Sequence, residues 1–139
     1  MPDAGSLWET IAANNLGTLA TIMRNGRPHL SDVNYAAEPG LIRISTVAHR
    51  VKTSNLRRDP RASLKVSGDA GYAVAEGTAE LSPVAAGLHD ATVEELIEVY
   101  RLVQGKEHPD WDDYRRAMVA DERLVVRLHV ERLYGWSFT

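Results

Sequence analysis

Basic side chains gather at one point of this chain, where they could bind an anion. Five of the sixteen Lys and Arg residues lie within the twelve positions 50–61, directly after the apolar run 41–47. If a helix begins within this segment, its first backbone N–H groups are unpaired and its dipole is positive at that end. Such a terminus attracts phosphate or carboxylate, and basic side chains beside it add charge-assisted hydrogen bonds. The segment is therefore a candidate anion site.

The basic residues differ in their position relative to the helix that we expect from about Thr53 to Arg58. The helix should end at Asp59, because a residue before proline is pushed out of the α region. Arg50 and Lys52 precede the predicted helix and could converge on one phosphate, whereas the later arginines could equally form a solvated charged face. Short polar side chains in the same turn add hydrogen-bonding groups. The candidate anion ligands are Arg50, Lys52, Thr53 and Asn55.

A second group of polar residues interrupts the strand-like segment 27–35. Ser31, Asp32 and Asn34 would need hydrogen-bond partners inside a barrel, and a ligand could supply them. The alternative follows from the two-residue period of a strand, which lets Asp32 and Asn34 face solvent while Ser31 points to the other side with Val33 and Tyr35. The sequence leaves both interpretations open.

Other chemistries lack the residues they need. The chain has no cysteine, which excludes disulfides, thiolate nucleophiles and cysteine metal sites. Its five histidines show no spacing typical of a metal site, so we expect no bound metal, and no nucleophile-elbow or phosphate-loop motif is present. The acidic segment 107–113 is better explained by helix capping than by cation binding. No catalytic side chain is assigned.

Composition limits the class of protein and its partners. With 139 residues, 44% of them hydrophobic, the chain fits one globular domain spanning 1–139. No apolar run is long enough for a membrane span and the N-terminus lacks the features of a signal peptide, so we expect a cytoplasmic protein. A pI of about 5.9 argues against nucleic acid. We expect a small anionic ligand instead.

Two hairpins and a single strand make up the predicted β-structure of the first 81 residues. Segments 17–23 and 27–35 flank Asn25-Gly26, a hairpin signal because both residues tolerate positive φ. The run 41–47 follows as a third strand. Segments 62–66 and 72–81 form a second hairpin around a Gly-containing turn.

Helices and a last strand complete the predicted order. Ser6 to Glu9 and Thr92 to Glu95 both read as capping boxes, with Ser6 and Thr92 as the N-cap residues. The second box opens an amphipathic helix that should end at Gly105, and another helix should begin at Asp110. A final strand is expected from Leu124 to about residue 134. The order predicts an antiparallel barrel with helices outside, mainly β with α.

Aromatic residues near the C-terminus offer a possible surface for a flat ligand. These residues are Trp111, Tyr114, Trp136 and Phe138. Aromatic side chains occur more often in cores and subunit interfaces, so the sequence does not assign them to a pocket.

Four segments, taken in order, resemble those of a known protein family. They are Gly-Arg-Pro-His-Leu-Ser at 26–31, the basic segment 50–61, Ala-Val-Ala-Glu-Gly-Thr-Ala at 73–79 and His-Pro-Asp-Trp-Asp-Asp-Tyr-Arg at 108–115. Together they are similar to the pyridoxamine 5'-phosphate oxidase-like split-barrel proteins, and within them to the actinobacterial branch that binds the deazaflavin coenzyme F420. The resemblance extends from about Leu16 to Tyr134.

The resemblance implies a six-stranded antiparallel split β-barrel with peripheral helices, forming a homodimer with cofactor sites at the subunit interface. It makes Arg50 and Lys52 the phosphate-binding pair, with Val51 between them and Thr53 and Asn55 as neighbouring contacts. The wall against the cofactor ring would consist of Ser31 and the backbone near Thr46.

The function implied is an F420-dependent oxidoreductase that transfers a hydride from the reduced coenzyme to a small organic electrophile. Two alternatives remain open at the level of sequence. One is an FMN-dependent enzyme of the same family, and the other is a non-catalytic F420-binding or carrier protein. The physiological substrate cannot be read from the sequence.

Overall fold

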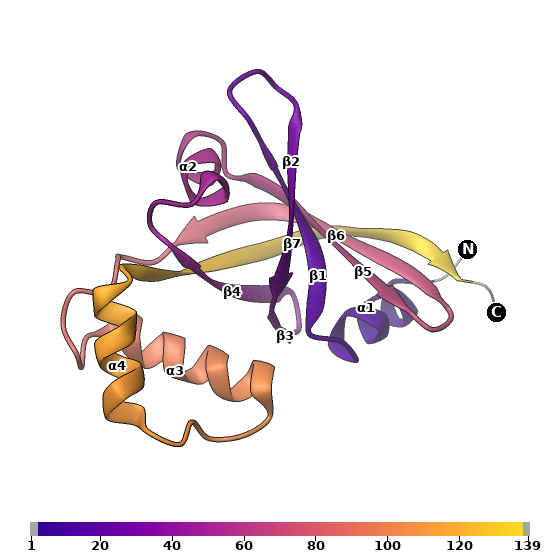
Figure 1. Cartoon of the computed structure of the whole chain (residues 1–139). Helices are drawn as coiled ribbons and strands as arrows, with labels where there is room; N and C mark the ends of the chain where they lie inside the picture. Colours follow the sequence, from indigo (N-terminus) through magenta and orange to yellow (C-terminus); the bar gives the residue numbers. More distant parts are fainter. Residues whose placement is uncertain (1–2, 138–139) are drawn as a thin grey trace.

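A curled antiparallel sheet and four helices make up the part of the chain that the computed structural model describes, residues 3–137 (Figure 1). The strands follow the order β2-β1-β5-β6-β7-β4-β3. The strands are β1 (Leu16–Ile22), β2 (Pro28–Asn34), β3 (Ala36–Glu38), β4 (Leu41–Val47), β5 (Arg61–Gly68), β6 (Gly71–Leu81) and β7 (Arg123–Ser137). The helices are α1 (Ala4–Ala12), α2 (Val51–Arg58), α3 (Ala91–Gln104) and α4 (Trp111–Ala120). The predicted fold class is confirmed.

The sheet has seven strands rather than the six expected. The predicted strand 27–35 ends at Asn34. The Tyr35 N–H still donates to the Asn15 carbonyl (3.0 Å), in the register of the β1–β2 ladder. The chain then changes partner and Ala36–Glu38 pairs with β4. A break in pairing of this kind leaves no mark on the alternation of residue types.

Both predicted hairpins are present, although the first uses a different turn from the one expected. Gly26 has φ of +84°, but Asn25 does not adopt positive φ. The Gly26 N–H donates to the Met23 carbonyl (2.8 Å), and the Asn25 side chain accepts from the Arg27 N–H (3.0 Å). Only one residue therefore needs the left-handed region, and glycine supplies it without a steric penalty.

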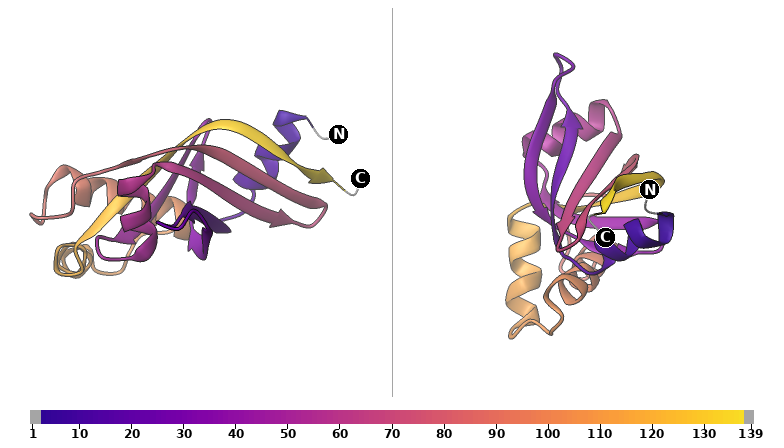
Figure 2. Two further views of the ribbon diagram at one scale, coloured as in Figure 1. Left: turned by 90° about the horizontal axis from the view of Figure 1, so that it is seen from above. Right: turned by 90° about the vertical axis from the view of Figure 1, so that its right-hand side faces the viewer.

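The curl of the sheet depends on a close approach between β6 and β7. Their register shifts between Glu76 and Gly77. A Cβ atom on Gly77 would lie 1.9 Å from the His129 carbonyl oxygen, so only glycine fits there. Figure 2 shows the two long strands bending together across the molecule. The concave side encloses the main core, which includes the fully buried Ile42, Ile44 and Leu64.

Helices α3 and α4 pack against each other with crossed axes at one end of the sheet, while α1 covers the opposite end of β6 and β7 (Figures 1 and 2). A second apolar core lies under the α3–α4 pair and includes Leu96, Met118 and Val125. The Asn15 side chain also donates to the Val103 carbonyl (2.9 Å) and ties α3 to the start of β1. This pair is therefore held firmly against β4 and β7.

Aspartates cap three of the helices, which corrects two of the predicted N-caps. Asp3 accepts from the Ser6 N–H and Asp90 accepts from the Val93 N–H, so neither Ser6 nor Thr92 is an N-cap. Thr92 is buried instead and donates to the Pro83 carbonyl. The predicted helix end at Gly105 (φ +67°) is confirmed. The helix predicted to begin at Asp110 is also present, with Asp110 as its N-cap and Trp111 as its first residue.

Helix α2 begins two residues earlier than predicted. It runs over Val51–Arg58, so Arg50 is the N-cap residue and Lys52 lies in the first turn. Across residues 3–137, no helix is both long enough and apolar enough to span a membrane.

Candidate functional site

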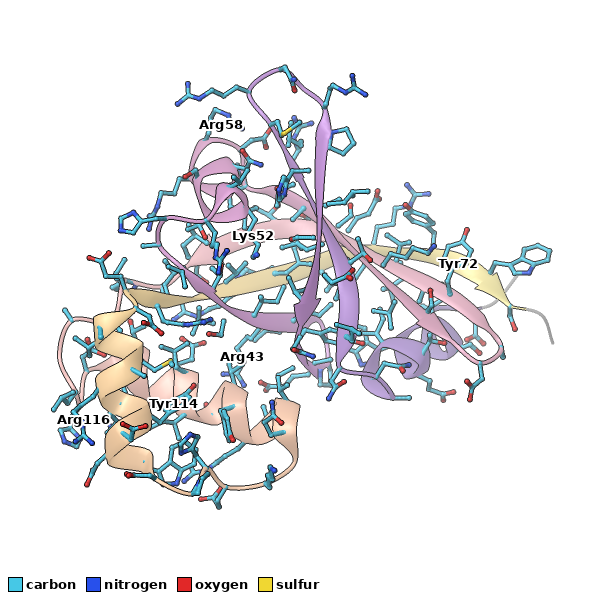
Figure 3. The ribbon with its side chains drawn as sticks, viewed as in Figure 1. Arg43, Lys52, Arg58, Tyr72, Tyr114 and Arg116 are labelled. Atoms are coloured by element: carbon cyan, nitrogen blue, oxygen red, sulfur yellow. The ribbon has the colours of Figure 1, made fainter. Side chains whose placement is uncertain are left out.

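A cavity of about 380 Å³ lies between the start of α2 and the α3–α4 pair. In Figure 3, Lys52 and Tyr114 come from opposite sides of β4, with α2 above the strand and α4 below it. The cavity is lined by Asp32, Val33, Asn34, Ser45, Thr46, Val47, Arg50, Lys52, Val99, Tyr100, Val103, Gln104, Tyr114, Met118 and Arg123. We call this cavity the anion pocket, because three of these residues are basic.

The sheet register brings the three basic residues to one place. Strand β4 pairs with β7 so that Val47 lies opposite Arg123, at the point where the chain leaves β4 for α2. Arg50 and Lys52 follow within five residues of that pair. Two segments separated by about seventy residues in sequence thus supply one cationic cluster, which we call the pocket cations: Arg50, Lys52 and Arg123.

No carboxylate among residues 3–137 forms an ion pair with any of the pocket cations. Arg123 has one weak contact from Nη1 to the Ser45 hydroxyl (3.3 Å), and its buried Nε has no hydrogen-bond partner. Burial and the neighbouring charges of Arg50 and Arg123 hold the pKa of Lys52 below its usual value. The pocket therefore holds positive charge that the protein itself does not neutralise.

The N-terminus of α2 also lacks a neutralising carboxylate, unlike those of the other three helices. Arg50 has the extended backbone of an N-cap (φ −76°, ψ 151°) but makes no side-chain capping bond, and the first turn contains no acidic residue. At α1, α3 and α4 an aspartate carboxylate fills this role. An anion bound from outside would supply the missing acceptor.

Of the other residues predicted to contact the ligand near α2, one lines the anion pocket and two form hydrogen bonds within the protein. Thr46 lines the anion pocket, whereas Thr53 is buried and donates to the Val47 carbonyl (2.8 Å), which fixes the turn from β4 into α2. Asn55 is also buried and donates to the Thr21 hydroxyl (3.1 Å). Its side chain anchors α2 to β1 and does not line the pocket.

Val51 and Ser31 also lie outside the anion pocket. Val51 is 54% exposed and borders a second hollow on the other side of α2, which also contains Arg57 and Arg58. The Ser31 hydroxyl is buried on the inner side of β2 without a partner. Asp32 and Asn34 lie on the same face of β2, as the two-residue period of a strand allows. Both are exposed, and both line the anion pocket.

The far wall of the pocket is aromatic and apolar. Tyr100 from α3 and Tyr114 and Met118 from α4 form it, and the two tyrosine rings pack edge to face (5.2 Å). The Tyr114 hydroxyl donates to the Leu96 carbonyl (3.0 Å), and burial raises its pKa to about 12. Tyr114 is therefore a fixed neutral wall at physiological pH.

The other aromatic candidates do not reach the pocket. Trp111 packs on Tyr100 behind this wall, and Trp136 is 54% exposed near the far end of β7. Phe138 lies outside the described residues. His49, at the β4–α2 turn, is exposed and pairs with Glu122. Within residues 3–137, no three metal-ligating side chains come together.

Sequence reasoning missed Arg123. A basic residue at the start of an apolar strand is common, and nothing in its neighbourhood indicates a ligand. Only the pairing of β4 with β7 places it beside the basic segment, and that pairing joins distant parts of the chain.

The fold and the pocket together define a split-barrel protein with a cationic pocket at the turn into α2. The sequence matches the pyridoxamine 5'-phosphate oxidase family over residues 7–137. The chain therefore belongs to that family, whose members bind flavins or F420 and include oxidoreductases.

Solved structures agree with this fold. A conserved hypothetical protein from Mycobacterium tuberculosis is 27% identical with a TM-score of 0.77, over 99% of this chain and 86% of that one. An F420 reductase is 16% identical (TM-score 0.70, 96% and 98% covered). An FMN-binding protein from Nostoc punctiforme is also 16% identical (TM-score 0.69, 99% and 85% covered). At 16% identity the last two show the shared fold alone.

Proposed function

We propose that this protein is an F420-dependent reductase that binds the phosphate group of the coenzyme with Arg50 and Lys52. One observation carries the proposal: cations surround a helix N-terminus that has no internal carboxylate. Phosphate fits this arrangement, because backbone N–H groups, the helix dipole and basic side chains all favour the same charge.

The chain's own residues would bind and orient the cofactor. When bound, reduced F420 would supply a hydride to an organic electrophile. Arg50 and Lys52 would fix the phosphate end, and the inner surface near Thr46 and Val33 would lie along the neighbouring part of the cofactor. Thr53 and Asn55 would keep α2 in place through their bonds to Val47 and Thr21.

No side chain is assigned as a proton donor. Tyr114 is committed to the Leu96 carbonyl and is neutral over the physiological range, and His49 lies outside the cavity lining. Binding and exclusion of water therefore account for the role of the protein in this proposal.

The proposal includes a homodimer with the cofactor between the subunits. Large apolar side chains on the hairpin at the β2 edge of the sheet support it, since Leu16 is 57% exposed and Leu30 is 63% exposed. Both lie on the β1–β2 hairpin, close to the residues of β2 that border the anion pocket. An exposed apolar edge strand favours pairing with a second chain.

Side-by-side titration of the purified protein with F420 and FMN tests the cofactor assignment. We expect F420 to bind and to lose fluorescence, and FMN to bind more weakly. A tighter FMN complex and a yellow protein as purified would overturn F420 in favour of the FMN-dependent alternative.

Lys52→Ala tests the phosphate site itself. Loss of a charge-assisted hydrogen bond costs about 1.5–3 kcal/mol, which weakens binding about 10- to 150-fold. Lys65→Ala is a matched control, because Lys65 is exposed on β5 and lies outside the anion pocket. F420 binding that is equal in all three proteins would contradict the site.

Turnover separates a reductase from a carrier. With reduced F420 bound, quinones, nitroaromatics and unsaturated lactones should each be tested for oxidation of the coenzyme, followed by absorbance. Tight binding without turnover of any acceptor would favour the non-catalytic protein.

A further inference from the structure

Arg123 carries a charge that a phosphate bound at Arg50 and Lys52 does not require. It comes from β7, on a different element from the other two pocket cations. Its neighbour Glu122 cannot neutralise it, because that carboxylate pairs with His49. The one carboxylate on the pocket rim, Asp32, accepts from the Thr18 hydroxyl and has no ion pair among the described residues.

The Arg123 side chain is arranged to accept a further anion. Its Nε is buried without a hydrogen-bond partner, and the bond to the Ser45 hydroxyl (3.3 Å) is its one side-chain hydrogen bond among residues 3–137. An unsatisfied buried donor is costly, so its side chain has hydrogen-bonding capacity that the protein does not use. A planar guanidinium matches the two oxygens of a carboxylate with parallel hydrogen bonds.

The surface next to Arg123 is suited to an apolar, flat molecule. Arg123 lines the same cavity as Tyr114, close enough for its charge to act on the Tyr114 phenol. Tyr100, Tyr114 and Met118 line the same cavity and are held by the packing of α3 on α4. Flat rings pack well on tyrosine faces and edges, and methionine adapts to their outline.

We propose that Arg123 binds the carboxylate of an organic acid whose apolar body lies against Tyr100 and Met118. The organic acid would be the second substrate of the proposed reductase. The assignment of this acid as a substrate rests on the proposed function. The binding site itself depends on Arg123 and the aromatic wall. Arg123 is a specificity residue in this scheme, distinct from the phosphate pair.

Benzoate and benzamide are the probes, because they share one shape and differ in charge. Calorimetric titration of the wild-type protein, with and without F420, should show benzoate binding about 10- to 150-fold more tightly than benzamide. Arg123→Gln should abolish this preference, whereas Arg123→Lys should keep part of it. Lys52→Ala should keep the preference and weaken F420 binding about 10- to 150-fold.

Any one of three results would overturn the inference. The first is a wild type that binds benzoate no more tightly than benzamide, and the second is a folded Arg123→Gln protein that keeps the preference. The third is an Arg123→Gln protein whose F420 binding is weakened as much as that of Lys52→Ala. The last outcome would make Arg123 a third phosphate ligand. If neither F420 nor FMN binds at all, the proposed function fails, but the comparison of benzoate with benzamide in the cofactor-free protein still decides the role of Arg123.

Discussion

Two clusters of basic residues near the β4–β7 pair have opposite surroundings. Arg43 and Arg127, which we call the paired arginines, contact the carboxylates of Glu38, Glu80, Glu95 and Glu98. The pocket cations, Arg50, Lys52 and Arg123, have no carboxylate partner among residues 3–137. The carboxylates of α3 neutralise the paired arginines and hold α3 on the sheet, whereas no described carboxylate neutralises the pocket cations. This difference is the basis for the proposal that the pocket cations bind a ligand.

The paired arginines illustrate the structural role. Arg43 is buried and extends from β4 toward α3, where its Nη2 lies 2.9 Å from a Glu98 oxygen (Figure 3). Glu95 is shared, since it also accepts from Arg127 Nε (3.0 Å). The hydrogen bond and charge of Arg43 hold the pKa of Glu98 below its usual value despite some desolvation.

Glu95→Gln should produce the largest change in stability. It removes the carboxylate common to both paired arginines. Arg43 keeps Glu38 and Glu98, but the partly buried Arg127 keeps only Glu80 (3.5 Å), so we expect a cost of about 3 kcal/mol, the low end for a buried pair. Urea unfolding monitored by circular dichroism measures this loss. A change below about 1 kcal/mol, the usual limit for an exposed pair, would remove the contrast between the two clusters.

Arg50→Asp should have the opposite sign. Its backbone already has N-cap geometry, so an aspartate would cap α2 as Asp90 caps α3. We expect a gain of about 0.5–1.5 kcal/mol in the free energy of unfolding without ligand, together with loss of F420 binding. The reverse change, Asp90→Ala, should cost about 1 kcal/mol.

Comparison of Arg50→Asp with Arg50→Asn distinguishes capping from general charge effects. Asparagine keeps a capping side chain without the negative charge, so Arg50→Asn should stabilise the protein less than Arg50→Asp. An Arg50→Asp protein that is less stable than wild type would mean that Arg50 has a structural role that its contacts do not reveal.

A smaller effect concerns pH. A bound anion favours charged Lys52, so the affinity is complete below the pKa of Lys52 in the free protein and declines as the pH rises through it. Because burial and the other pocket cations lower that pKa, F420 affinity should fall before the pH reaches the ordinary lysine value of about 10.4. Lys52→Arg should bind with no such decline, since arginine stays charged. A wild-type profile that is flat to the same pH would contradict the role of Lys52.

The sequence predicted the elements better than their connections. Asn25-Gly26, Gly105 and Asp110 marked turns and helix ends correctly, because each acts through its own backbone or its near neighbours. The two N-caps assigned to Ser6 and Thr92 were wrong because Asp3 and Asp90, slightly upstream, cap the helices instead and each helix begins before the predicted residue. Local signals compete, and the sequence does not show which one prevails.

The candidate site was predictable only on one side. Arg50, Lys52 and Thr46 were named from the sequence and line one cavity, whereas Thr53 and Asn55 turned out to hold α2 in place. Arg123 and Tyr100 could not be assigned to the site, because strand pairing and helix packing bring them there from distant segments. Whether the named residues bind a cofactor stays a prediction.

The central proposal is that the pocket cations bind an anionic group of a ligand. The most direct test measures the free energy of unfolding of wild type and Lys52→Ala, each with and without F420. Without F420 the variant should be at least as stable as wild type, because the substitution removes the repulsion between Lys52 and the neighbouring Arg50 and Arg123. At a free F420 concentration of 100 times the wild-type Kd, wild type should gain about 2.7 kcal/mol and the variant only about 0.3–1.4 kcal/mol. A variant that is destabilised without F420 and gains as much as wild type with it would contradict the account.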